Sequence, residues 1–179
     1  MTQFSIGGLV LGKNPVIKNI QYGEISNDST SATATGTIDA VDTANSVVMW
    51  LGNRMGNDSA TPDRYFNRLT LTNATTVTAT RGSTQQEEHF ISFVVIEFHA
   101  GVLKLNQVGT LVCDDASITD TITGVNTTKA WLVEQGQMGD FVDDELFSTM
   151  TLTDSTTVTM NRKDTTGIVT RSYAVIEFF

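Results

Sequence analysis

Threonine and apolar residues alternate along two stretches of the chain, residues 76–80 (TVTAT) and 156–160 (TTVTM). A period of two is the pattern of a strand with one buried face. Thr is the commonest residue, Val and Ile are abundant, and Pro occurs only at Pro15 and Pro62. This composition favours strands over helices. No segment combines a helical stripe with caps at both ends, so the sequence predicts an all-β fold.

The apolar runs and the polar turns between them predict twelve strands. Asn73-Ala74 and Asp154-Ser155 are typical of tight turns, because Asn and Asp tolerate left-handed backbone and hydrogen-bond their own chain. Short strands with turns every 8–12 residues indicate an antiparallel sandwich or barrel. The predicted strands are 16–26, 31–38, 45–52, 64–72, 75–81, 89–99, 102–112, 117–123, 128–135, 145–153, 156–162 and 168–178.

The second half of the chain repeats the first. LTLTNATTVTATR at 69–81 returns as MTLTDSTTVTMNR at 150–162, and three further blocks recur in the same order. Such self-similarity indicates a duplicated unit. We therefore predict two tandem six-stranded antiparallel β-sandwich modules, residues 16–99 and 102–179, with an unrepeated N-terminal arm, residues 1–15. The chain passes from one module to the other within His99-Ala100-Gly101, and so short a connection predicts that the modules pack side by side.

The N-terminal arm is apolar and rich in Gly. One hypothesis is that it adds a strand to, or covers an edge of, its own module. The other is that it contacts a partner protein, since exposed apolar patches usually mark contacts. The residues that would make this contact are Phe4, Ile6, Leu9, Val10 and Leu11.

Composition narrows the classes of function. The net charge of −9 disfavours binding to nucleic acid, whose phosphates it repels. No apolar run reaches the ~18 residues of a membrane-spanning helix, and the first residues do not form a convincing signal peptide. The one cysteine, Cys113, excludes an intrachain disulfide and a Cys-based metal site, and we expect it to be a strand residue. We predict no cofactor and no membrane partner.

Glu97 and Glu177 occupy the same place in the two modules, inside otherwise apolar final strands. A carboxylate there must be paired or must reach water. The repeated cations that could pair with them are Arg81, Arg162, Lys18 and Lys104. A catalytic or metal-binding carboxylate is the alternative. Because both modules keep the residue, we favour structural ion pairs, and we expect a hairpin of the last two strands to bring Arg81 to the foot of the last strand.

Other candidate groups occur in one module only. His89 lies beside Glu87 and Glu88, and His99 ends the last strand of module one; we expect both histidines at the surface. An acidic loop in module two lacks the spacing of a calcium loop, and we expect it to be solvated. Its members are Asp140, Asp143, Asp144 and Glu145.

Aromatic side chains offer a further set of candidates. Trp50 and Trp131 lie in corresponding strands but three positions apart, which predicts opposite faces; burial is the default expectation for both. Aromatic residues in the predicted loops could stack on sugars, namely Tyr65, Phe66, Phe141 and Phe147. No sequence motif of a common hydrolase, metalloprotease or nucleotide-binding enzyme occurs.

The first module carries four characteristic blocks. They are Val16-Ile17-Lys18 with Gln21 and Gly23; Thr37-Ile38, Val41-Asp42 and Ser46; Leu71-Thr72-Asn73, Thr75 to Ala79 and Arg81; and Val95-Ile96-Glu97-Phe98. In these blocks the repeated unit resembles a module of structural proteins from tailed phages and prophages. The resemblance covers nearly all of the chain after residue 15. Module two departs at Val108 and at Ala130. The length and closing strand also resemble H-type lectin domains, six-stranded sandwiches that form trimers, at the level of fold alone.

This resemblance implies a non-enzymatic virion protein, most specifically a capsid decoration (cement) protein. It would lie on the capsid surface, be made in the bacterial host cytoplasm, and bind the major capsid protein or other virion proteins. We expect a homo-oligomer, a trimer in preference to a dimer. A carbohydrate-binding head-fibre or tail-tip module is the second hypothesis. A glycosidase is the third, and it would need two carboxyl groups ~5–9 Å apart in a cleft.

Overall fold

The computed structural model describes residues 5–6, 9–10, 15–27, 31–56, 66–82, 88–139, 147–163, 165 and 167–179. Its described part is all-β, as the sequence predicts, and one short 3-10 turn, η1 (Thr43–Asn45), interrupts the strands. The strands are β1 (Ser5–Ile6), β2 (Leu9–Val10), β3 (Ile17–Asn27), β4 (Thr33–Thr37), β5 (Ser46–Met55), β6 (Asn67–Asn73), β7 (Thr76–Arg81), β8 (His89–Phe98), β9 (Leu103–Cys113), β10 (Ser117–Thr121), β11 (Ala130–Gly139), β12 (Ser148–Leu152), β13 (Thr157–Arg162) and β14 (Val169–Phe178).

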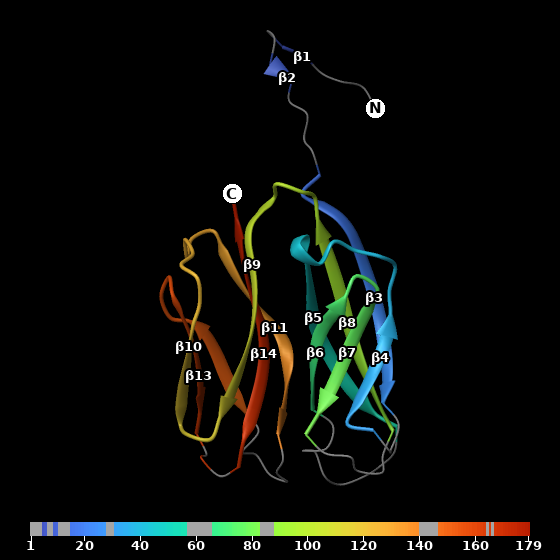
Figure 1. Cartoon of the computed structure of the whole chain (residues 1–179), viewed down its shortest axis with the longest axis vertical. Coiled ribbons are helices and arrows are strands. Elements are labelled where there is room, and N and C mark those ends of the chain that lie inside the picture. Colours follow the sequence, from blue (N-terminus) through green and yellow to red (C-terminus); the bar gives the residue numbers. More distant parts are fainter. Residues whose placement is uncertain are drawn as a thin grey trace.

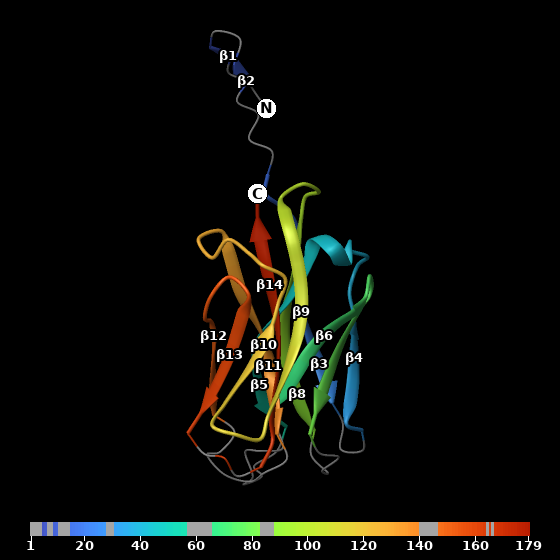
Figure 2. The same ribbon diagram turned by 60° about the vertical axis from the view of Figure 1, so that its left-hand side comes forward.

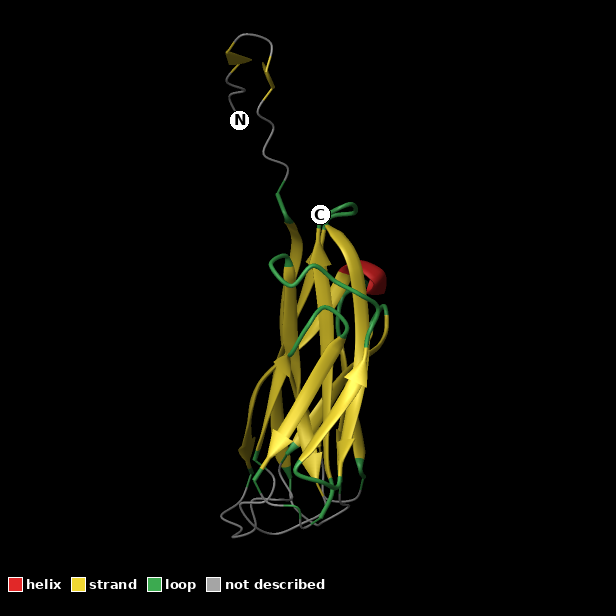
Figure 3. Ribbon diagram, turned by 90° about the vertical axis from the view of Figure 1, so that its left-hand side faces the viewer, coloured by secondary structure: helices red, strands yellow, loops and turns green. Residues whose placement is uncertain are grey.

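These strands form one six-stranded, two three-stranded and one two-stranded antiparallel sheet (Figures 1 and 2). The orders are β3-β8-β5, β4-β7-β6-β11-β14-β9, β10-β13-β12 and β1-β2. A single residue pair, Gly136 opposite Arg68, joins β11 to β6 in the six-stranded sheet. Without that pair, each half of the chain would hold two sheets of three strands. The strands run roughly along the long axis of the molecule (Figure 3).

All twelve predicted strands exist, with ends shifted by a few residues. One predicted connection was wrong: β7 and β8 do not form a hairpin. β7 pairs with β4 and β6, whereas β8 pairs with β3 and β5 in another sheet. The chain therefore crosses between layers after Arg81. Periodicity indicates a strand but not its neighbour, so this crossover was invisible in the sequence.

Alternation along the strands places the apolar side chains in separate cores. The first core belongs to residues 25–95 and includes Ile25, Leu69 and Phe93, all at most 2% exposed. The second belongs to residues 111–175 and includes Met160 and Tyr173. Burial of each large side chain contributes ~1.5–3 kcal/mol, which makes these cores the main source of stability.

A third apolar cluster lies between the halves. It combines Val47 and Phe98 with Leu103, Val133 and Ile176. The rings of Phe98 and Phe178 meet edge to face, 5.7 Å apart. The predicted side-by-side packing of the halves is therefore present, and its apolar centre ties β5 and β8 to β11 and β14.

The N-terminal arm does not add a strand to any of the larger sheets over its described residues. β1 and β2 pair with each other, Ser5 with Val10 and Ile6 with Leu9. They lie beyond the end of the sheets at which β3 begins (Figure 1). Among the described residues, no helix is long and apolar enough to span a membrane.

Candidate functional site

The two repeated glutamates each hold a lysine and a loop. Lys18 Nζ lies 2.8 Å from Glu97 Oε1, and the same oxygen accepts the Asp42 amide at 3.0 Å. In the second half, Glu177 Oε1 accepts Lys104 Nζ at 2.9 Å and the Asn126 amide at 3.1 Å. We call this arrangement the Lys–Glu clasp. It fixes the loop after β4, or after β10, onto the sheet that contains the first strand of that half.

The clasp keeps its carboxylates ionised. Burial raises the pKa of Glu97, but hydrogen bonds from Lys18 and from the Asp42 amide outweigh it and lower the pKa below the ordinary value. The hydrogen bond from Lys104 lowers the pKa of Glu177 in the same way. A general acid needs a raised pKa at neutral pH. These carboxyl groups are tuned in the opposite direction.

The repeated glutamines also have a structural role. Gln21 exchanges two hydrogen bonds with the backbone of Asp39, at 2.7 and 3.0 Å. Gln107 does the same with the backbone of Thr123, at 2.9 and 2.8 Å. These pairs anchor the same loop that the clasp holds.

The repeated glycine makes room for an aromatic ring. A Cβ on Gly23 would lie 2.3 Å from Cζ of Phe93, and one on Gly109 would lie 2.3 Å from Cζ of Tyr173. Tyr173 also donates a hydrogen bond to Asp120 at 2.6 Å. Burial and that carboxylate raise the pKa of Tyr173. Two motif positions, the glycine and the aromatic residue, thus form one packing unit in each half.

The repeated arginines do not contact the glutamates, contrary to one of the predicted pairings. Arg81 Nε donates to the carbonyl of Ser31 at 3.0 Å, and Arg162 Nε donates to that of Asp115 at 3.1 Å. Both arginines are nearly buried and lie at the opposite end of the last strand from the clasp. They close the turn between the first two strands of each half. Sequence could not separate lysine from arginine as the partner, because strand order across two sheets decides it.

His89 is buried, so the prediction of a surface histidine was wrong. It is 0% exposed and lies between Asn67 Nδ2, 2.8 Å from Nε2, and Arg81, 3.2 Å from Nδ1. This polar cluster is not evident from the sequence, because Asn67 lies 22 residues before His89 along the chain. Asn27, directly opposite His89 in β3, is also fully buried. In the second half, the apolar residue Val169 of β14 takes the place of His89. The polar cluster is therefore present in the first half alone.

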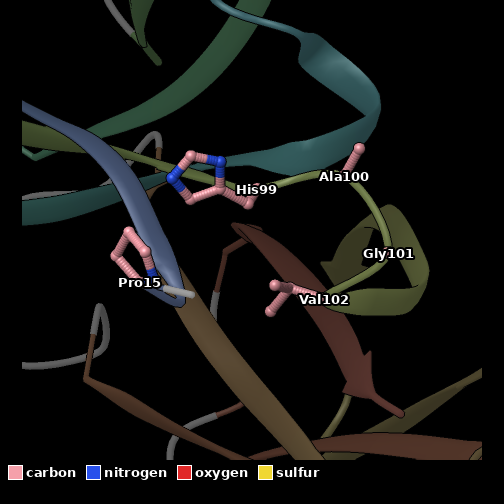
Figure 4. A pocket seen from close by; sticks show the side chains of 5 residues that line it. All are labelled: Pro15, His99, Ala100, Gly101 and Val102. Atoms are coloured by element: carbon pink, nitrogen blue, oxygen red, sulfur yellow. The ribbon is translucent and has the colours of Figure 1, made fainter. Parts of the chain in front are cut away.

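A hollow of about 540 Å³ lies at the junction of the halves. Figure 4 shows Pro15, His99 and Val102 around it, with Ala100 and Gly101 on the turn from β8 to β9. His99, which was expected at the surface, is half-buried. It is the only titratable side chain among the described lining residues. The described lining therefore offers no pair of groups for acid–base chemistry.

Two further hollows flank β12. One, of about 340 Å³, is lined by Leu132, Glu134, Ser148, Thr149, Met150 and Arg171. The other, of about 510 Å³, is lined by Phe147, Ser148, Thr149, Asn161, Arg162 and Lys163. The ring of Phe147 is 65% exposed and meets Phe66 edge to face at 6.1 Å. Arg171 pairs with Glu134 and donates to the Ser148 carbonyl.

The two tryptophans differ as their spacing predicts. Trp50 packs against the first core, and its Nε1 donates to Asn53 Oδ1 at 2.9 Å. Trp131 is exposed, so burial of both, the default expectation, was wrong. Cys113 is a fully buried strand residue whose thiol donates to the Asp115 carbonyl.

Several predicted candidates lie outside the described residues. They are Phe4, Leu11, Tyr65, Glu87, Asp140, Phe141, Asp143, Asp144 and Glu145. Within the described part of the chain, no group of three or more His, Cys, Asp or Glu side chains is placed to hold a metal ion.

Comparisons with protein-family models, curated proteins and solved structures found no match for this chain.

Proposed function

We propose that the chain consists of two tandem six-stranded β-sandwich modules, residues 16–99 and 102–179, and is a non-enzymatic structural protein of a tailed-phage virion. The specific role that we favour is capsid decoration, in which many copies bind the major capsid protein and stabilise the head. The resemblance of the repeated motifs supports this role. So does the use of those motifs, because the repeated Lys, Glu, Gln, Arg and Gly residues hold loops and rings in place.

The observation that carries the proposal is the set of apolar side chains on the outer faces of the sheets. Tyr22 in β3 is 76% exposed, and Val108, at the corresponding place in β9, is 64% exposed. Ile20 and Val112 on the same strands are also exposed. Exposed apolar surface usually marks contacts with other proteins. A decoration protein would bury such surface against its neighbours.

The mechanism would be mechanical. Each copy would cover a seam between capsid subunits, and several weak contacts would act together through multivalency. The net charge of −9 would keep the free protein soluble and away from the packaged nucleic acid. The apolar arm, with Ile6, Leu9 and Val10, remains a candidate contact with a partner protein.

The direct test is the copy number of this chain in purified virions, measured by quantitative mass spectrometry against the major capsid protein. Decoration predicts a number of the same order as the capsid protein. Particles that lack the chain should then release their DNA at a lower temperature than complete particles. A few copies per particle, or no copies, would exclude the cement role.

The hollow beside β12 favours carbohydrate binding in a head fibre or tail tip as the second candidate. Phe147 offers a ring face, and Asn161 and Lys163 offer polar groups around the same 510 Å³ space. Sugar sites combine an aromatic surface with a few polar groups. A glycan array probed with a multivalent form of the protein, with Phe147→Ala as the control, tests this role. Absence of hits that depend on Phe147 would exclude it.

A further inference from the structure

The contact between the two halves uses different surfaces on each side. From the second half, Gly136 of β11 lies opposite Arg68 of β6, so close that a Cβ would be 2.2 Å from the Asn67 carbonyl oxygen. Asn106 of β9 donates to the Ser46 carbonyl at 2.8 Å. We call the edge of β11 around Gly136 the donor surface. The β6 side, with Asn67 and Arg68, is the acceptor surface.

The first half carries its own copy of the donor surface, and this copy is uncovered. In β5, Gly52 stands at the same bulge as Gly136, and both have positive φ, 131° and 90°. Nothing lies within 4 Å of a Cβ built on Gly52. The preceding residue, Leu51, is 51% exposed, whereas its counterpart Gln135 is 2% exposed.

The same difference recurs at the position of the Asn106 contact, on β3, which lies on the other side of β8 from β5. Ile20 in β3 occupies the place of Asn106 in β9, the residue that binds the first half. Ile20 is 44% exposed. An apolar residue therefore stands uncovered where the second half has its docked contact.

The second half carries an uncovered copy of the acceptor surface. Ser148 and Thr149 of β12 correspond to Asn67 and Arg68, because Ser148 faces Arg162 as Asn67 faces Arg81. Among the described strands, β12 pairs with β13 alone, and the 340 Å³ hollow lies along it. Unpaired edges of this kind are templates for another strand. β6, its counterpart, meets Gly136 of β11 there.

We propose that a second copy of this chain occupies these surfaces: β5 of one copy docks on β12 of the next, with Gly52 opposite Thr149. The contact would repeat, between chains, the edge pairing of β11 with β6 within a chain. The apolar cluster between the halves would not be repeated, because Val47 of β5 is already buried in it. It is heterologous, so it produces a closed ring if the rotation closes and a filament if it does not. The inference names surfaces for the homo-oligomer that the sequence resemblance implies, and so deepens the proposed structural role.

The acceptor surface of the second half is more polar than that of the first. Arg171 stands in β14 where Ile91 stands in β8, and Glu134 stands in β11 where Trp50 stands in β5. Their ion pair lines the hollow. Docking between chains therefore buries a charged pair that the contact within the chain lacks. We expect it to be weaker and more sensitive to salt than the contact within the chain.

Leu51→Glu in the full-length chain tests the donor side, with multi-angle light scattering as the readout. The wild type should have the mass of several 19.4 kDa chains, and Leu51→Glu should reduce this to one chain. Val112→Glu is the matched control: it adds the same charge at a residue 50% exposed, in β9 of the second half, a strand that the proposed contact does not use. It should leave the assembled mass unchanged. Circular dichroism checks that each variant is folded.

Thr149→Glu tests the acceptor side, and a mixture tests the direction of the contact. Thr149 is exposed on its edge strand, so the substitution should not unfold the chain. Each single variant should be monomeric. A mixture of Leu51→Glu and Thr149→Glu chains should form dimers with one of each, because one variant keeps a donor and the other keeps an acceptor.

A monomeric wild type would overturn the proposal. So would an assembly that tolerates Leu51→Glu or Thr149→Glu, or a mixture that stays monomeric. The assay uses the purified chain alone, so its outcome is separate from the virion test. Self-association without virion incorporation would refute the proposed function only, and incorporation of a monomer would refute this contact only.

Discussion

Removal of one carboxylate of the Lys–Glu clasp should lower the free energy of unfolding. It should abolish no catalytic activity, because we expect the role of this carboxylate to be structural. In the Glu97→Ala variant, two hydrogen bonds to a charged acceptor are lost, at 2.8 Å from Lys18 and at 3.0 Å from the Asp42 amide. Such bonds contribute ~1.5–3 kcal/mol each. The Lys18 side chain is 52% exposed, so its share falls to ~0–1 kcal/mol. The expected loss of unfolding free energy is about 2–4 kcal/mol.

Thermal unfolding followed by circular dichroism measures this loss. At roughly 2–4 °C per kcal/mol for a chain of this size, the Tm should fall by about 5–15 °C. Glu24→Ala is the control, because Glu24 and Arg54 form an ion pair in which both side chains are well exposed, 43% and 60%. An exposed pair contributes ~0–1 kcal/mol, so this Tm should move by a few degrees at most.

The clasp also predicts how stability depends on pH. The pKa of Glu97 is lowered from its ordinary value of 4.5, because the hydrogen bonds outweigh burial. The stability that its carboxylate contributes is therefore complete above pH 4.5 and is lost as pH falls through the lowered, folded-state pKa. The difference in Tm between the wild type and Glu97→Gln should shrink over that acidic window.

Two results would refute this reasoning. One is a Glu97→Ala variant that melts with the Glu24→Ala control, which would mean that the clasp contributes no stability. The other is a Glu97→Ala variant that keeps its Tm and loses a measurable turnover on a glycoside or other substrate. The second result would make the carboxylate catalytic.

Three further substitutions probe packing and the contact between the halves. Gly109→Ala should lower the free energy of unfolding by about 1–3 kcal/mol, because its Cβ would overlap the Tyr173 ring. In the same denaturant titration, the control Gly124→Ala should leave the free energy of unfolding unchanged, because the atom nearest to its Cβ is 3.7 Å away. Tyr173→Phe should cost about 0.5–1.5 kcal/mol by removing the hydrogen bond to Asp120, and an unchanged denaturation midpoint would contradict that bond. Gly136→Ala should expose the seam between the halves to limited proteolysis, and protection equal to the wild type would contradict the close approach.

The sequence by itself determined the local structure. Period-two alternation marked the two Thr-rich strands, since a strand with one buried face must alternate, and apolar runs bounded by turn residues marked the other ten. The turns at Asn73 and Asp154 were also predictable, because their side chains bond backbone amides two residues on, at 2.9 and 2.7 Å. The repeat also identified Glu97 and Glu177 as residues at the same position in both halves.

Tertiary structure decided which of these elements meet. It placed Lys18, and not Arg81, against Glu97, and it buried His89 beside Asn67. It also joined the halves through Gly136, whose missing side chain matters only because β6 passes there. The physical reason is common to all three cases. Alternation fixes the face of a residue, whereas its neighbours across a sheet or an interface depend on strand order, which is a property of the whole chain.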